Sequence, residues 1–166
     1  RPSFSKETVD EYFTSRYQSS TDIDTSKLTW MPKPSPDGPA TPFNTTPLRP
    51  TDVKNVLRKK ISKSSPGPDG IYYGMLKKLS STHHFMATLF TKVMETGLPP
   101  PNWSKSKISL IYKQGDPTDP ANFRMISLSN AVGKIYHQIL SERFERFMID
   151  NELIDTKLQK AFLKGI

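Results

Sequence analysis

The stretch Lys107-Ile-Ser-Leu-Ile-Tyr-Lys113, followed by Phe123-Arg-Met-Ile-Ser-Leu128, decides the fold class of this chain. Both stretches are short and rich in β-branched and aromatic residues, a composition that favours β-strands. Residues 114–122 form a connection that is longer than usual for a hairpin, but it can join two antiparallel strands. We therefore expect a two-stranded antiparallel hairpin in this part of the chain.

The sequence on both sides of the expected hairpin has helical periodicity. Before it, we expect helices from Ser5 to Tyr17, from Thr51 onward, around residues 71–79, and up to Gly97. After it, Asn130 is expected to cap a long helix, and a short helix is expected near residues 158–163. The expected apolar faces contain, in chain order, Val9, Tyr12, Phe13 and Tyr17; Val53, Val56, Leu57 and Ile61; Phe85, Met86, Leu89, Phe90, Val93 and Met94; and Ile135, Ile139, Leu140, Phe144, Phe147 and Met148. Arg143 and Arg146 are expected to lie outside the last face. The predicted fold class is α+β, mostly helical with one short antiparallel hairpin.

Prolines set residues 19–50 apart from the regions on either side. Because proline has no amide hydrogen to donate, this stretch is predicted to be an extended linker, with Trp30 and Phe43 attaching it to the body. The chain then divides into an N-terminal helix (1–18), the linker (19–50) and a main region (51–166). Since the sequence opens on Arg1 and closes on Ile166 directly after an apolar pattern, we expect a piece of a longer protein.

The composition favours a polyanionic partner. The formal net charge is +8, and a basic domain binds nucleic acid partly through counterion release from phosphates. Basicity that serves solubility alone is an equally good reading of the charge by itself. The chain has no Cys, which excludes disulfides, thiolate zinc sites and a Cys nucleophile. No apolar run approaches the roughly 20 residues of a membrane span, so we expect no membrane partner.

Candidate catalytic groups are scattered. Carboxylates and imidazoles show no metal-ligand spacing, and the adjacent His83 and His84 point about 100° apart on a helix, so we interpret them as ordinary histidines. The loop from Ser62 to Gly70 could offer amides to a phosphate, but it lacks the Gly-Lys-Ser/Thr ending of a nucleotide-binding P-loop. A structural turn between two helices is the simpler reading of this loop.

Two cations frame the expected hairpin connection. Lys113 ends the first strand and Arg124 begins the second, so antiparallel pairing brings both to the same end of the ribbon. A guanidinium fork and a compact ammonium group there could bind a triphosphate and stabilise its charge during phosphoryl transfer. Taken alone, two cations at such a place are more often solvated surface.

A series of short segments, in order and with their spacing, resembles the reverse transcriptases of non-LTR (LINE-type) retrotransposons. These segments are Ser65-Pro-Gly-Pro-Asp-Gly-Ile71, Gly97-Leu-Pro99 with Trp103, Ile111-Tyr-Lys-Gln-Gly-Asp116, Asn122-Phe-Arg-Met-Ile-Ser-Leu128, Lys134, Ile139-Leu-Ser-Glu-Arg-Phe144 and Gln159-Lys-Ala-Phe162. Two positions depart from the family pattern, because Met125 stands where the family usually has Pro and Ala161 where it usually has Gly.

The resemblance implies that residues 51–166 are the N-terminal fingers portion of an RNA-directed DNA polymerase, a nucleotidyltransferase of a transposable element. Lys113 and Arg124 would then contact the incoming deoxynucleoside triphosphate. The RNA template would be gripped by the basic helix and the proline-glycine loop, through Lys54, Arg58, Lys59, Lys60, Lys63, Ser65, Gly67, Asp69 and Gly70. The implied partners are RNA template and DNA primer, and the implied location is the nucleus.

The same resemblance implies that catalysis lies elsewhere in the parent protein. The family holds Mg²⁺ with palm aspartates, one in a strand and two in a Phe/Tyr-x-Asp-Asp turn, and no Asp-Asp pair occurs in this chain. We therefore expect no catalytic or metal-binding residue here and no primer extension by the chain alone. The alternatives are a non-catalytic RNA- or DNA-binding remnant, domesticated or truncated, and a protein-interaction domain.

Overall fold

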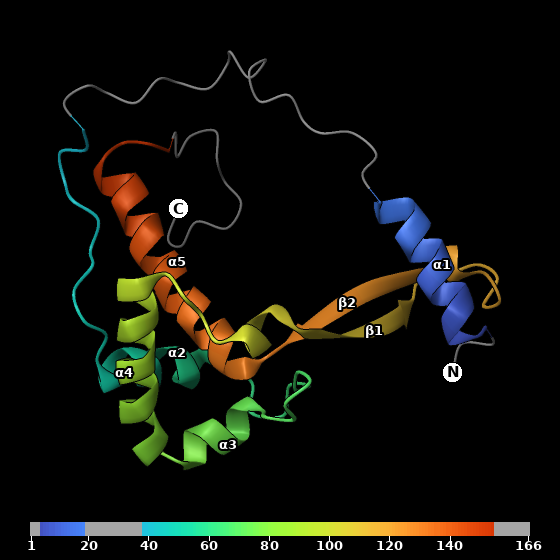
Figure 1. The fold of residues 1–166 in the computed structure, drawn as a ribbon, viewed down its shortest axis with the longest axis horizontal. Coiled ribbons are helices and arrows are strands. Elements are labelled where there is room, and N and C mark those ends of the chain that lie inside the picture. Colours follow the sequence, from blue (N-terminus) through green and yellow to red (C-terminus); the bar gives the residue numbers. More distant parts are fainter. Residues whose placement is uncertain (1–3, 19–37, 155–166) are drawn as a thin grey trace. The chain divides into compact units, whose positions relative to one another are not determined.

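The computed structural model describes residues 4–18 and 38–154, and Figure 1 shows the chain. Clustering of the backbone gives two compact units. The first contains residues 1–36 and Ile108–Ser127, and the second contains Asp37–Lys107 and Leu128–Ile166. The predicted boundaries at residues 18 and 50, and the helix predicted near residues 158–163, stay predictions, the latter because it lies outside the described residues.

The first unit combines an N-terminal helix with the end of the predicted hairpin. Helix α1 (Lys6–Tyr17) begins as expected at Ser5, whose side chain accepts a hydrogen bond from the Thr8 amide at 3.2 Å. Strands β1 (Ser106–Tyr112) and β2 (Phe123–Ser129) pair in a two-stranded antiparallel sheet, which confirms the hairpin. A short 3₁₀ turn, η3 (Pro120–Asn122), leads into β2 and contacts α1.

The described residues of the second unit form four α-helices: α2 (Pro50–Lys59), α3 (Tyr73–Lys78), α4 (Ser81–Thr96) and α5 (Ala131–Asp150). A 3₁₀ turn, η2 (Pro101–Ser104), precedes β1. Helix α2 packs against both α4 and α5 (Figure 1). The largest fully buried side chains are Phe90, Leu57, Ile135, Val53 and Val56. The α+β class is thereby confirmed at the level of secondary structure.

Several details of the helical predictions are wrong. Helix α2 starts at Pro50 rather than Thr51, because Arg49 occupies the N-cap position and its amide donates to the Asp52 carboxylate at 2.8 Å. Ile61 lies beyond the end of α2 and is 77% exposed. Phe85 is 69% exposed because the buried stripe of α4 runs through His83, Ala87 and Phe90, which leaves Phe85 off that stripe. Tyr17 and Phe144 are also exposed.

The described part of the proline-rich stretch is fastened along α5. Phe43 packs edge-on against Phe147 at 5.8 Å, which confirms its predicted contact, whereas Trp30 lies outside the described residues. Arg143 donates to the backbone carbonyls of Asn44 and Thr46, at 3.1 and 2.8 Å. Arg143 was expected outside the packed face and instead holds this segment in place. Two further hydrogen bonds join the Asn151 side-chain amide to the Thr41 backbone.

Asn130 corrects another expectation. It stands at the N-cap of α5, but its side chain makes no capping hydrogen bond. Its Nδ2 donates instead to the carbonyl of Asn102, at 2.8 Å. Asn102 lies in the turn before β1, and Asn130 directly follows β2. This bond therefore links the chain segments that enter and leave the hairpin. Asn130 is 2% exposed, and its Oδ1 has no partner among the described residues.

Candidate nucleic-acid interface

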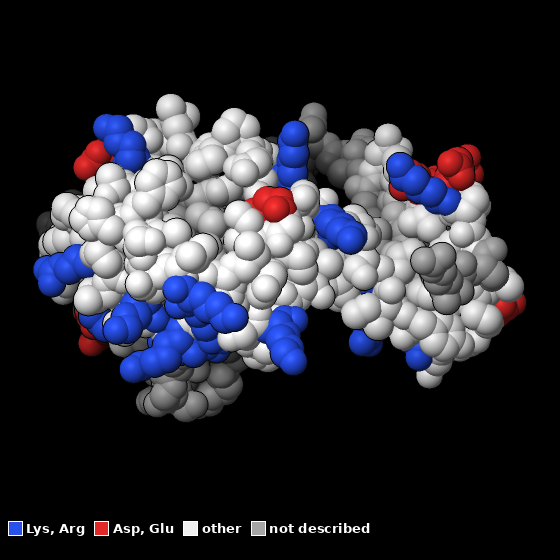
Figure 2. Space-filling view, turned by 90° about the horizontal axis from the view of Figure 1, so that it is seen from below, with Lys and Arg blue, Asp and Glu red and all other residues white. Residues whose placement is uncertain are grey.

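The basic side chains of α2 and its C-terminal flank differ in their surroundings. Lys54 and Arg58 are exposed, and Lys59 pairs with Glu142 of α5 at 3.3 Å. Lys60 is half-buried and donates to Gln138 of α5 at 3.3 Å. Figure 2, seen from the side on which α2 and α3 lie, shows Lys and Arg side chains gathered on this face. Of these four basic residues predicted to grip a template, Lys54, Arg58 and Lys59 share α2 and Lys60 follows it, and only Lys54 and Arg58 are exposed without an ion pair among the described residues.

The proline-glycine loop is a tight turn rather than an open cradle. The Gly70 amide donates to the Gly67 carbonyl at 3.2 Å, and the Ile71 amide donates to the Asp69 carboxylate at 3.1 Å. Two amides that could have faced a phosphate are thus used inside the loop. Lys63, Ser65, Asp69 and Gly70 are exposed.

Gly67 is the buried member of this loop. A Cβ at position 67 would lie 2.7 Å from the Ser129 carbonyl carbon and 2.8 Å from both the Asn130 nitrogen and Oδ1. Only glycine allows this approach of the loop to the junction of β2 and α5. The structure therefore assigns Gly67 a packing role, and its predicted template contact remains untested.

A cluster that the sequence did not single out surrounds Tyr73, at the start of α3. The ammonium groups of Lys60 and Lys134 lie 6.0 and 5.7 Å from the centre of its ring. Lys77 reaches the backbone carbonyl of Lys60. Burial raises the pKa of Tyr73. Spacing alone could not reveal this cluster, because its members come from separate elements.

The hairpin end places the two predicted nucleotide-binding cations on one face. The rings of Tyr112 and Phe123 lie 5.3 Å apart and so project from the same face of the ribbon. Because side chains alternate along strands, Lys113 and Arg124 share the opposite face. Both are exposed, and among the described residues neither side chain has a hydrogen bond or ion pair. Phe4 packs edge-on against Phe123 at 5.0 Å and covers the apolar face.

Hydrogen bonds order the connection between the strands. The Lys113 amide donates to the Asn122 carbonyl at 2.8 Å, which continues the ladder beyond β1. Asn122 Nδ2 donates to the Asp116 carbonyl at 2.9 Å. The Thr118 hydroxyl and amide both donate to the Asp116 carboxylate, at 2.6 and 2.8 Å, and these bonds lower the pKa of Asp116. The long connection therefore has a defined conformation that fixes the Lys113 end of the ribbon.

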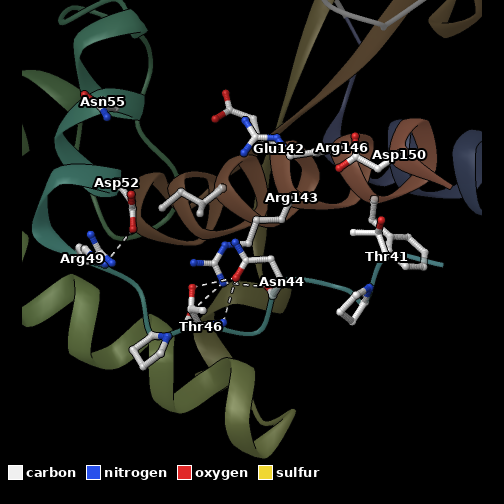
Figure 3. Close-up of a pocket in the computed structure, with 14 residues that line it drawn as sticks. Thr41, Asn44, Thr46, Arg49, Asp52, Asn55, Glu142, Arg143, Arg146 and Asp150 are labelled. Carbon is white, nitrogen blue, oxygen red and sulfur yellow. Dashed lines mark hydrogen bonds between the residues drawn. The ribbon is translucent and has the colours of Figure 1, made fainter. Parts of the chain in front are cut away.

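A pocket of about 440 Å³ lies between residues 41–47, the start of α2 and the second half of α5 (Figure 3). Its charged lining includes Arg49, Asp52, Arg143, Arg146 and Asp150. Figure 3 shows Arg143 directed at Asn44 and Thr46, and Asp52 directed at Arg49. Asp52 and Arg143 already bond within the chain, so the pocket offers no evident constellation for acid-base or nucleophilic chemistry.

Metal and membrane features are lacking in the described ranges. Within residues 4–18 and 38–154, no group of three His, Asp or Glu side chains could hold a metal ion. His83 is buried and bonds through Nε2 to the Leu76 carbonyl at 2.9 Å, whereas His84 is exposed. No helix in this part of the chain is long and apolar enough to cross a membrane.

Comparison with known proteins finds relatives among mobile-element polymerases. No protein-family model matches it. It is 30% identical over 105 residues to a probable RNA-directed DNA polymerase from transposon X-element of Drosophila melanogaster, a match that covers 62% of this chain and 12% of that protein. It is 32% identical over 94 residues to the RNA-directed DNA polymerase from mobile element jockey of the same organism, covering 55% and 10%.

A third relative is similar over a longer stretch. The Pol polyprotein from type-1 retrotransposable element R1 of Bradysia coprophila is 26% identical over 117 residues, or 69% of this chain and 12% of that protein. These relatives are RNA-directed DNA polymerases and Pol polyproteins of mobile elements. The chain is similar to the reverse transcriptases of non-LTR retrotransposons, which confirms the resemblance predicted from the motifs. It spans about a tenth of the length of these curated relatives.

Proposed function

We propose that this chain is the fingers portion of a non-LTR retrotransposon reverse transcriptase, where it grips the RNA template and the incoming nucleotide. The observation that carries the proposal is the pair Lys113 and Arg124 on one exposed face of an ordered hairpin end. This pair falls within the segments that resemble the polymerase family. On the opposite face Phe123 is buried against Phe4, whereas Lys113 and Arg124 are exposed, so the cationic face is available to a ligand.

The chemistry of the pair suits a triphosphate. Arg124 offers a planar fork that can donate two hydrogen bonds to phosphate oxygens, and Lys113 adds a compact positive charge. Cross-strand neighbours on a diagonal lie about 7–8 Å apart at their α-carbons, a separation that long cationic side chains can bridge around one polyphosphate. In the proposal, these groups bind and orient the nucleotide and stabilise charge during phosphoryl transfer.

The template is assigned to the second unit. Lys54 and Arg58 are exposed cations on one helix, and exposed cations without carboxylate partners bind phosphates without regard to base sequence. Lys63, Ser65, Asp69 and Gly70 lie close by in sequence and are exposed. RNA binding by the 166-residue chain should therefore weaken with salt, by roughly 0.7 in log K per phosphate contact for each unit of log salt.

The complete polymerase supplies the chemical step in this proposal. Mg²⁺ and the palm aspartates would act there, together with the DNA primer, and the described residues of this chain offer no group that could hold the metal. We assign the present residues only binding and orienting roles. A nuclear location belongs to the same proposal.

Replacement of Arg124 in the complete polymerase tests the nucleotide role. Arg124→Ala should lower kcat/KM for the nucleotide by about 10- to 100-fold, which corresponds to about 1.4–2.8 kcal/mol of lost transition-state stabilisation. Lys107→Ala is the matched control, since it removes an exposed cation near the other end of β1. An Arg124→Ala enzyme with the kcat/KM of the control would refute the assigned role.

A further inference from the structure

The cluster around Tyr73 collects three lysines from separate elements. Lys60 follows α2, Lys77 lies near the end of α3, and Lys134 lies in the first turn of α5. The ammonium groups of Lys60 and Lys134 both lie within 6.0 Å of the ring centre, and Lys77 donates to the Lys60 carbonyl. All three lysines are half-buried.

This arrangement concentrates positive charge. The ring face attracts ammonium groups, which offsets part of their mutual repulsion. Lys60 donates to Gln138, which in turn donates to Glu142, and Glu142 also pairs with Lys59. Among the described residues, Lys77 and Lys134 have no salt bridge to any carboxylate. Two cations are therefore held in place, partly withdrawn from water and without counter-charge from the chain.

We propose that Lys77 and Lys134 form a binding position for a phosphate of a single-stranded nucleic acid backbone, with the Tyr73 ring beside the Lys134 ammonium group. An anion at this point would relieve the repulsion between the lysines and accept hydrogen bonds from their ammonium groups. The inference rests on the proposed template role, and it adds two residues to the predicted set.

The backbone phosphate is the favoured form of this anion. Exposed Lys54 and Arg58 lie on α2, which ends next to Lys60, so positive charge continues from the cluster onto a helix surface. Figure 2 shows such a spread of Lys and Arg on the face seen from the side of α2 and α3. A repeating anion can use charges distributed in this way, whereas a single free phosphate can use only the cluster.

Titration of the 166-residue chain with labelled single-stranded RNA at several salt concentrations tests this inference. Lys77→Gln and Lys134→Gln should each weaken binding about 3- to 10-fold and reduce the salt slope by roughly 0.7. Lys134→Arg should keep most of the affinity because the charge is retained. Lys92→Gln is the matched control, since Lys92 is an exposed lysine on α4 that already pairs with Glu95 at 3.5 Å. The Lys92→Gln variant should bind the RNA with the same affinity as the unchanged chain.

The outcomes separate the two proposals. If the unchanged chain binds RNA in a salt-dependent manner but both glutamine variants bind equally well, the phosphate position is wrong and the template role stands. If the unchanged chain shows no salt-dependent binding, the template role itself fails. Displacement of RNA by millimolar inorganic phosphate would identify a free-phosphate site and overturn the backbone assignment. Should Lys134→Gln unfold, as judged by circular dichroism, Lys134→Met removes the charge but keeps an unbranched apolar side chain of similar length at this half-buried position.

Discussion

Gly67→Ala distinguishes a packing role from a template role for the proline-glycine loop. The added Cβ would lie 2.7 Å from the Ser129 carbonyl carbon and 2.8 Å from the Asn130 nitrogen and Oδ1. Two of these neighbours are backbone atoms, which cannot rotate away as the end of a flexible side chain could. Either the loop or the junction between β2 and α5 must shift, and overpacking of this kind costs about 1–3 kcal/mol.

Urea denaturation followed by circular dichroism measures this cost. With a urea m value of about 2 kcal/mol/M, a loss of 2 kcal/mol lowers the transition midpoint by about 1 M. Ser65→Ala serves as the control, because Ser65 is exposed in the same loop and its replacement should change the free energy of unfolding by less than about 0.5 kcal/mol. A Gly67→Ala chain with unchanged stability and weakened RNA binding would refute the packing role and support template contact.

Two further predictions concern the segment around Asn44 and Thr46, which Arg143 holds, and the connection between the hairpin strands. Arg143→Ala removes two hydrogen bonds from a charged donor and should lower the free energy of unfolding by about 2 kcal/mol, whereas Arg146→Ala, exposed on the same helix, should change it by less than about 0.5 kcal/mol. Equal stability of the two variants in urea titrations would contradict this reasoning. The lowered pKa of Asp116 means that its bonds from Thr118 are present above the ordinary Asp pKa, about 4, and are lost as pH falls through the lowered value. The Thr118 amide resonance should therefore shift in that acidic range and stay constant in Asp116→Asn.

The sequence predicted the secondary structure well because local signals are strong in this chain. Ser5 caps α1, Gly97 ends α4 in the left-handed conformation, and the two β-branched stretches form the hairpin. Periodicity also selected most of the buried residues of α2, including Val53 and Val56. It failed where tertiary packing decides, since Phe85 and Phe144 continue an apolar pattern but face solvent.

The candidate sites were predictable only in part. Alternation along strands is a local rule, so the shared face of Lys113 and Arg124 followed from sequence together with the pairing. The Tyr73 cluster depends on how α2, α3 and α5 pack, and no spacing rule links Lys77 to Lys134. Arg143 was misread for the same reason, because its partners lie about a hundred positions earlier in the chain, at Asn44 and Thr46.

The motifs that carry the family resemblance serve different purposes. Gly67 and Asn130 meet at the root of the hairpin, and a Cβ at Gly133 would lie 3.1 Å from the Trp103 ring. Asn130 also bonds to the carbonyl next to Trp103, that of Asn102. These contacts join residues 65–71 and the segment around Trp103 to the start of α5, so Gly67 and Trp103 are explained by packing. Lys113 and Arg124 have no such internal contacts in the described part of the chain, and packing does not explain their charge. Substitutions of Lys113 and Arg124 should therefore affect function first. Substitutions of Gly67, Asn130 and Gly133 should affect stability first.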